Sequence, residues 1–393
     1  MTMLPKNACA YPFKAAMLQH GVPATPCCRF HDRFLDSSDK ESINTYSATF
    51  ADIRETMMRN EWHAGCYKCR ADEESKGSSM RTEANEFFKD FDDVARLEYL
   101  EITVGRLCNL ACVTCGPEFS HTWDKDAIAL GMESQEKITR LQQKQEYDLR
   151  DLNLDNLKYL RNIKVTGGEP FLHRQFLEFI VKLADSGLAQ QINIEIFTNC
   201  TWWPAKVEYD ALAKFKRIRI CPSIDGYGIT NDIVRYPSKF SKIEQTLDQW
   251  IAFRDEFNAV EKDKVTIASA TTVNVLNAPA MFEYMHWARV NKGIDVVLQS
   301  VYEPNYLSII HWPQWYKRTL AFVADAQFDN FNNKRGRYVA AHRLIKKLCA
   351  TPTASNEDNS EEYLIKIQQL LEHRGQSIED MPHFARILKY NDR

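Results

Sequence analysis

The chain has 393 residues, of which 44% are hydrophobic and 26% charged, and its formal net charge is -3. This composition is ordinary for a globular protein with one large and one smaller domain, and the charge gives no general attraction to nucleic acid or anionic membranes. The sequence shows neither a secretory signal nor an apolar stretch of about 18 residues that could span a bilayer, so we expect a cytoplasmic protein. In that reducing compartment the eleven cysteines are better explained as metal ligands, reactive groups or buried side chains than as disulfides.

Residues 1–94 contain five of these cysteines and show little periodicity, as expected of a small domain held together by metal. Cys66 and Cys69 form a Cys-x2-Cys pair, and Cys9, Cys27 and Cys28 lie upstream. Together they provide the four ligands that either a zinc ion or a closed iron-sulfur cluster takes. The type of ligand alone does not separate these two alternatives.

Between residues 95 and 310, short apolar runs alternate with amphipathic helical stretches. Strands are predicted in the segments 96–104, 162–170, 192–199, 217–225, 265–274 and 295–302. Strands separated by helices pair in parallel, so the fold class is α/β. Six units are too few for a closed eight-stranded barrel, which leaves an open doubly wound sheet or a partial barrel, and both gather ligands at the C-terminal ends of the strands. Residues 311–393 are predicted to form a helical extension.

The first predicted strand leads directly into the segment CNLACVTC, which contains Cys108, Cys112 and Cys115. A structural zinc site and a closed 4Fe-4S cluster each take four protein ligands, so three cysteines leave one iron of a cluster open. Zinc with His121 as its fourth ligand is the alternative interpretation of the same pattern.

The second predicted strand ends in Gly167, Gly168, Glu169 and Pro170. The two glycines have no side chains to keep a ligand from the backbone, and the glutamate can accept a charge-assisted hydrogen bond from an ammonium group. Taken alone, the segment could be only a turn. With Cys-x3-Cys-x2-Cys after the first strand and GGEP after the second, the chain resembles the radical S-adenosylmethionine (SAM) superfamily.

The resemblance implies a partial (β/α)6 TIM-like barrel over residues 95–310, with a 4Fe-4S cluster held by Cys108, Cys112 and Cys115. In that superfamily the open iron chelates the amino and carboxylate groups of SAM. An electron passed from the cluster cleaves SAM to methionine and a 5′-deoxyadenosyl radical, which takes a hydrogen atom from the substrate. A reduced flavodoxin or ferredoxin-type donor is the implied partner.

The resemblance also implies contacts to SAM from the ends of the third and fourth strands. Thr198 and Asn199 end the third strand, and Ser223 and Asp225 lie in CPSIDGYG at the end of the fourth. By resemblance, they would meet the ribose hydroxyls or the methionine carboxylate of SAM. Each could instead be a helix cap or a turn residue.

The N-terminal cysteines resemble the twitch half of a SPASM domain, placed here before the barrel. This resemblance implies a second, auxiliary 4Fe-4S cluster in residues 1–94. Its ligands would be Cys9, Cys66, Cys69 and either Cys27 or Cys28, of which Cys27 is preferred.

We therefore expect a radical SAM enzyme that acts on an unactivated C–H bond. SPASM and twitch relatives often modify peptides, so a peptide or protein side chain is the expected substrate, with a nucleotide, a modified DNA base or a small metabolite as alternatives. Nucleic acid is not indicated as a partner, and no membrane partner is expected. A non-enzymatic zinc or iron-sulfur module for binding or redox sensing is the competing hypothesis. Residues that could line the substrate pocket are His121, Trp123, Tyr302, Asn305 and Tyr306.

Overall fold

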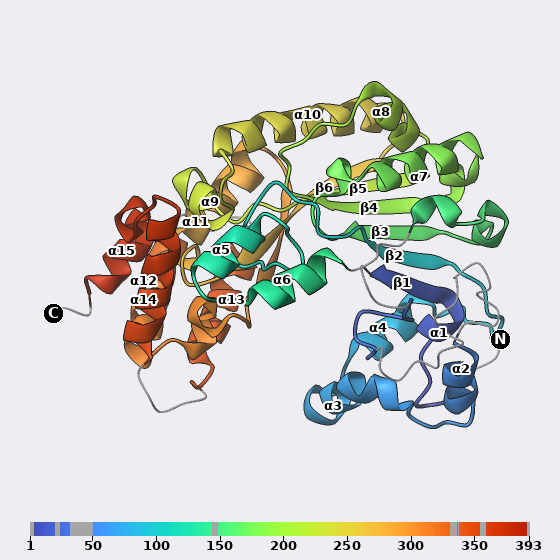
Figure 1. Cartoon of the computed structure of the whole chain (residues 1–393), viewed down its shortest axis with the longest axis horizontal. Helices are drawn as coiled ribbons and strands as arrows, with labels where there is room; N and C mark the ends of the chain where they lie inside the picture. The colour runs from blue at the N-terminus through green and yellow to red at the C-terminus, as the bar shows by residue number, and fades with distance from the viewer. Residues whose placement is uncertain are drawn as a thin grey trace. The chain divides into compact units, whose positions relative to one another are not determined.

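The computed structural model describes residues 4–19, 24–31, 50–143, 148–330, 336, 338–353 and 359–390, which form a mixed α/β fold (Figure 1). The strands are β1 (Ala15–Gln19), β2 (Tyr99–Thr103), β3 (Asn162–Thr166), β4 (Asn193–Thr198), β5 (Arg217–Pro222), β6 (Val265–Val273) and β7 (Asp295–Ser300). They follow one another in chain order in one sheet, and the pairs β1–β2, β2–β3, β3–β4 and β6–β7 are parallel. The predicted α/β class is confirmed, and the six predicted strands are β2 to β7, in the order expected of a partial barrel.

Strand β1 is an additional strand of the sheet that the sequence pattern did not predict. It pairs with β2 in a register that places Leu18 opposite Ile102. Its first four residues, AAML, are all buried, so the strand lacks the alternation of apolar and polar residues by which a half-buried strand is recognised in a sequence. Alanine, which fills two of these positions, is also a weak strand former. The backbone of Met17 also exchanges hydrogen bonds of 2.7 and 3.0 Å with Thr25, which ties the segment before Cys27 to this strand.

The helices lie mainly between and after the strands. They are α1 (Tyr11–Lys14), α2 (Ala51–Met58), α3 (Tyr67–Lys76), α4 (Met80–Phe87), α5 (Trp123–Ala129), α6 (Gln135–Gln142), α7 (Arg174–Asp185), α8 (Lys206–Ala213), α9 (Ile229–Val234), α10 (Phe240–Asn258), α11 (Met281–His286), α12 (Gln314–Asn330), α13 (Val339–Ala350), α14 (Ser360–His373) and α15 (Pro382–Leu388). Shorter turns include η7 (Pro170–Leu172), the π-helix η10 (Trp287–Asn291) and η11 (Asn305–Leu307). Among the helices that the structure describes, none has the length and apolar character needed to cross a bilayer.

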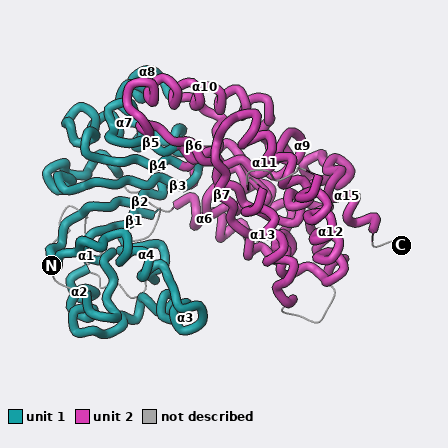
Figure 2. Tube along the Cα trace, turned by 180° about the vertical axis from the view of Figure 1, so that it is seen from behind, with its two compact units in different colours: residues 1–105, 144–196, 204–219 teal, residues 106–143, 197–203, 220–393 magenta. Residues whose placement is uncertain are grey.

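The chain divides into two compact units (Figure 2). Unit 1 comprises Met1–Gly105, Lys144–Ile196 and Pro204–Arg219, and unit 2 comprises Arg106–Gln143, Phe197–Trp203 and Ile220–Arg393. In unit 1, α7 packs against α8 and buries the predicted apolar face that includes Phe176, Phe179 and Leu183. The helix ends just before Gly187, whose φ of 81° is the left-handed conformation that favours glycine at this place.

In unit 2, α10 packs on β6 and buries Ile243, Leu247 and Trp250, which repeat at helical spacing. The predicted C-terminal helical segment is α14, and α12, α13 and α15 accompany it. An aromatic cluster joins these helices, with ring centroids 4.5 Å apart for Trp312 and Tyr316 and 6.0 Å apart for Trp312 and Phe384. Unit 2 therefore has a core of its own, and it includes the Cys108 loop.

Candidate active site

The loop after β2 brings its three cysteines together in unit 2. Cys108, Leu110 and Cys112 form one buried cluster, and Cys115 packs against it. Burial raises the pKa of the Cys112 thiol to about 12 and that of Cys115 to about 11. The thiols are therefore protonated in the metal-free chain, and a metal that binds them must displace their protons.

Backbone hydrogen bonds hold this loop in place. The Cys108 amide donates to Nδ1 of His121 at 3.2 Å, and the Thr122 hydroxyl donates to the Cys108 carbonyl at 2.6 Å. The indole nitrogen of Trp123 donates to the Cys112 carbonyl at 2.9 Å. The loop is thus anchored through its main chain, which leaves the sulfur atoms to other partners. Within the described ranges, no three His, Cys, Asp or Glu side chains are grouped closely enough to hold one metal ion.

A second segment of unit 2 pairs with the cysteine loop and delivers a buried arginine. The amides of Ala111 and Val113 donate to the carbonyls of Tyr236 and Val234 at 2.6 and 2.8 Å. These bonds flank Arg235, the residue between the two acceptors. The geometry of the loop therefore depends on the turn that follows α9.

Arg235 pairs with Asp225, one of the residues predicted to contact SAM. Nη1 of the arginine lies 2.7 Å from Oδ2 of the fully buried aspartate, whose Oδ1 accepts a hydrogen bond from the Thr272 amide at 2.6 Å. Burial alone would lower the pKa of Arg235, but a thiolate at Cys112 and the carboxylate of Asp225 outweigh it and raise that pKa. Nε of Arg235 is buried and has no hydrogen-bond partner among the described residues.

Arg374, which follows α14, is a second buried arginine in the same unit. Its guanidinium lies over the rings of Trp123 and Tyr236, at 4.5 and 4.8 Å from their centroids, and its Nε is 2.9 Å from Oδ2 of Asp126. Both terminal nitrogens are buried without a hydrogen-bond partner among the residues that the structure describes. A donor left unpaired in a protein interior costs free energy, so an anionic partner would stabilise this arrangement.

The other residues of unit 2 that are predicted to contact SAM lie at the ends of β4 and β5. Nδ2 of Asn199 lies 3.8 Å from the sulfur of Cys108 and 2.7 Å from Oδ1 of Asn109. The Ser223 amide donates to the Thr198 carbonyl at 2.7 Å, so these two strand ends are adjacent. Unit 2 therefore brings Asn199 to the cysteine loop and places Ser223 beside Thr198.

The GGEP segment belongs to unit 1, where it packs on the end of β2. Gly167 has a φ of 118°, and a Cβ atom there would lie 2.9 Å from the Val104 nitrogen and 3.1 Å from the Gly105 oxygen. The Gly168 amide donates to that same oxygen at 2.8 Å. A side chain at position 167 would therefore force the two strand ends apart, which explains the glycine.

Glu169 is fully buried immediately after the glycines. Its Oε1 accepts a hydrogen bond of 3.2 Å from the Phe171 amide, which begins the short turn η7 together with Pro170. The side chain is fixed by this cap, as expected of a carboxylate that must present an oxygen at a defined place.

Four of the five N-terminal cysteines influence one another in unit 1. Burial, followed by the charges of Cys66 and Cys69, raises the pKa of Cys9 to about 12, and burial with the charges of Cys27 and Cys69 does the same for Cys66. Burial, and next the charge of Cys9, raises the pKa of Cys27. Cys28 is exposed, and its pKa is raised first by desolvation and then by the charge of Glu101.

Two contacts hold this group of cysteines in place. Arg81 pairs with Glu73 and donates to the carbonyls of Lys6 and Ala8 at 2.9 and 2.8 Å, so it ties together α3, α4 and the segment before Cys9. In addition, Gly65 lies against the ring of Phe30, where a Cβ atom would approach to 2.3 Å.

A cavity of about 740 Å³ in unit 2 opens beside the cysteine loop, and we call it the Trp123 cavity. It is lined by residues 114–119, Trp123, Ala127, residues 130–133, Glu303, Pro304, Tyr306, Lys366 and Gln369. Of the residues predicted to line a substrate pocket, Trp123 and Tyr306 are in this lining. His121, Tyr302 and Asn305 are not among its lining residues.

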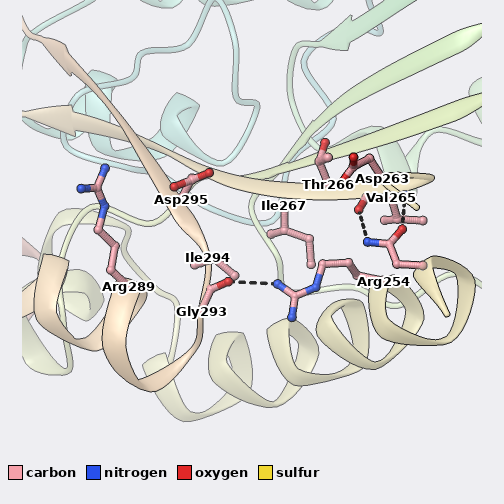
Figure 3. Close-up of a pocket in the computed structure, with 10 residues that line it drawn as sticks. Arg254, Asp263, Val265, Thr266, Ile267, Arg289, Gly293, Ile294 and Asp295 are labelled. Atoms are coloured by element: carbon pink, nitrogen blue, oxygen red, sulfur yellow. Dashed lines mark hydrogen bonds between the residues drawn. The ribbon is translucent and has the colours of Figure 1, made fainter. Parts of the chain in front are cut away.

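A different cavity, of about 460 Å³, lies where β6 and β7 begin. Figure 3 shows Arg254 donating to the Gly293 carbonyl, a bond of 3.0 Å, with Arg289 and Asp295 also in the lining. Ligands of parallel α/β proteins gather at the opposite, C-terminal ends of the strands. The Trp123 cavity, next to Cys115, is therefore the better candidate for a substrate site.

Solved structures are similar to parts of this chain. One described as native anSMEcpe with bound AdoMet is 18% identical, and the match covers 60% of this chain and 61% of that protein, with a TM-score of 0.39. Another, Streptococcus suis SuiB bound to S-adenosylmethionine, is 16% identical over 75% of this chain and 64% of that protein, with a TM-score of 0.37. The chain thus spans less than two thirds of either protein. No protein-family model and no curated protein matches the sequence.

Proposed function

We propose that the chain is a radical SAM enzyme in which Cys108, Cys112 and Cys115 hold a 4Fe-4S cluster. The observation that carries this proposal is the buried positive charge beside the three thiols. Arg235 and Arg374 both interact electrostatically with Cys112, and together they have three buried donor nitrogens without partners among the described residues.

The chemistry of this donor set fits an anionic iron-sulfur centre. Thiolates are the usual protein ligands of such clusters, and hydrogen bonds to cluster sulfur adjust the reduction potential. The three thiols of the cysteine loop supply the ligands. The unpaired guanidinium nitrogens of Arg235 and Arg374 supply donors for hydrogen bonds to cluster sulfur. A neutral apolar site would leave the arginine donors unpaired, which costs free energy.

Other residues of the chain have defined tasks in this proposal. Gly168 has no side chain to keep the methionine part of SAM from the backbone, and the fixed carboxylate of Glu169 accepts a hydrogen bond from its ammonium group. The Asn199 amide, 3.8 Å from the Cys108 sulfur, orients that ligand. The cluster and SAM, when bound, supply the radical that takes a hydrogen atom from the substrate, and the protein positions the substrate and excludes water.

The N-terminal cysteines complete the proposal with an auxiliary cluster. We assign Cys9, Cys27, Cys66 and Cys69 as its ligands, because these four side chains are buried or partly buried while Cys28 is exposed. A peptide or protein side chain is the proposed substrate, on the basis of the twitch-like arrangement of these cysteines. A reduced flavodoxin or ferredoxin-type protein is the proposed electron donor.

Anaerobic reconstitution with iron and sulfide tests the assignment. The protein should bind about eight irons and release 5′-deoxyadenosine from SAM only when a reductant is present. Cys112→Ala should lose about half of the iron and all of the cleavage, while a conservative change at the buried Cys349, on α13 in the C-terminal extension, should leave both intact. Full cleavage activity in Cys112→Ala, or a colourless zinc protein, would contradict the proposal.

A further inference from the structure

The Trp123 cavity combines an apolar lining with a polar edge. Pro117, Ala127 and Leu130 contribute apolar surface together with the rings of Trp123 and Tyr306. Tyr306 is largely buried, and desolvation raises the pKa of its phenol, which therefore stays neutral. Such a lining suits a ligand with an aliphatic stem, because burying apolar surface is favourable.

The charges at this cavity are predominantly negative. Glu118 and Glu133 both pair with the single ammonium of Lys137, the former at 2.7 Å, so two carboxylates share one positive charge. The hydrogen bonds that Lys137 donates to Glu118 and then to Glu133 raise its pKa, which keeps it charged.

A third carboxylate, that of Glu303, adds to this negative charge. Glu303 is exposed at the cavity and forms no ion pair with any of the described residues. The one lysine in the lining, Lys366, is neutralised by Glu362 at 2.6 Å. The carboxylate of Glu303 is therefore available to a cationic ligand at the edge of the cavity.

We propose that the Trp123 cavity binds a cationic side chain, a lysine or arginine of a peptide, with its aliphatic stem against Trp123 and Tyr306 and its charge toward Glu303. That this ligand is the substrate of the radical reaction rests on the function proposed above. Long cationic side chains bury their methylene groups on apolar surface and keep the charged end at a polar edge, which is the combination this cavity offers. An aromatic ring such as that of Tyr306 also attracts cations.

The position of the cavity agrees with this assignment. Cys115, the third proposed cluster ligand, belongs to the lining, as does the segment from Gly116 to Phe119 that follows it. A side chain held here lies beside the cysteine loop within the same compact unit. The site would thus select residues by charge immediately next to the proposed cluster.

Two matched probes test the charge preference on the full-length, reconstituted protein. N-acetyl-lysine N-methylamide carries the ammonium group, and N-acetyl-norleucine N-methylamide has a similar aliphatic stem without it. Ligand-observed NMR titration should show the lysine probe binding about tenfold more tightly than the norleucine probe, an advantage that shrinks as salt is raised. Equal affinities for the two probes would overturn the proposal.

A pair of variants tests the site. Glu303→Gln should weaken binding of the lysine probe about fivefold, as expected for one exposed charge pair, and leave norleucine binding unchanged. Glu372→Gln is the control, because this exposed residue on α14 is not in the cavity lining. If Glu303→Gln binds lysine as the unmodified protein does, or if both variants weaken it equally, the assignment of the cation to this cavity is wrong.

Release of 5′-deoxyadenosine, measured on the same preparations, separates this inference from the proposed function. Cleavage of SAM with no preference for lysine over norleucine would reject the cationic ligand and leave the radical chemistry standing. A preference for lysine that depends on Glu303, without cleavage of SAM, would support the ligand class and reject the radical chemistry.

Discussion

The guanidinium of Arg374 lies 4.5 Å from the centroid of the Trp123 ring, although these residues are about 250 positions apart in the chain. The same arginine pairs with Asp126, and its side chain is 1% exposed. Arg374→Lys should lower the free energy of unfolding by about 1–3 kcal/mol, because lysine keeps the charge but loses the planar stacking and the hydrogen bond that Nε donates to Asp126. Chemical denaturation would measure this, with the exposed Arg386→Lys as a control. Equal stability of the two variants would show that the stacked arginine contributes nothing.

Cys27 is partly buried and Cys28 is exposed, so we expect substitutions at these two adjacent positions to have different consequences. Cys27→Ser should lower the iron content of the reconstituted protein from about eight toward about four, since a ligand of the proposed auxiliary cluster is lost. Cys28→Ser should leave it unchanged, because this side chain is exposed and its sulfur lies 3.7 Å from that of Met80. Iron and sulfide analysis measures both variants. Iron loss only in Cys28→Ser would reverse the assignment.

The contact of Gly65 with Phe30 predicts that Gly65→Ala disturbs the same cluster. The added Cβ atom at position 65, directly before Cys66, would approach the Phe30 ring to 2.3 Å. The ring, which lies three residues after Cys27, would therefore have to move. We expect iron content to fall as it does in Cys27→Ser. A second change, Phe30→Ala, removes the obstacle and should recover part of the iron. No recovery in the double variant would mean that the glycine acts in another way.

Glu73 predicts a dependence of stability on pH. Hydrogen bonds from Arg81 lower the pKa of this carboxyl below its usual value. The pair therefore stabilises the fold above about pH 4.3, where the unfolded carboxyl is also ionised, and this stabilisation is lost as the pH falls through the lower folded pKa. Glu73→Gln should be less stable than the unmodified protein at pH 7, and thermal melts should show the difference shrinking below about pH 4. Glu86→Gln, an exposed residue of α4, should show no such trend.

Alternating apolar residues were sufficient to predict strands β2 to β7. Isoleucines at 192, 194 and 196, for example, alternate along β4 and are buried in the structure. Strand β1 was missed because four consecutive buried residues give no alternation, and its pairing with β2 depends on a partner about 80 residues away.

The grouping of Cys108, Cys112 and Cys115 in the structure could be predicted because their spacing is local. Arg235 and Arg374 could not, since a charged residue in a polar segment is usually at the surface. Their burial follows from tertiary partners, namely Asp225 for the first and Asp126 with two aromatic rings for the second. No sequence pattern around Arg235 or Arg374 predicts those partners.

The pairing of β1 with β2 has a consequence for the solubility of the folded chain. Loss of β1 would expose those backbone N–H and C=O groups of β2 that face β1, while the groups on the other side stay paired with β3. An open strand edge of this kind is a template on which other chains can add strands and aggregate. The cysteine-rich N-terminal segment would then protect the sheet from self-association, whether or not a cluster is bound.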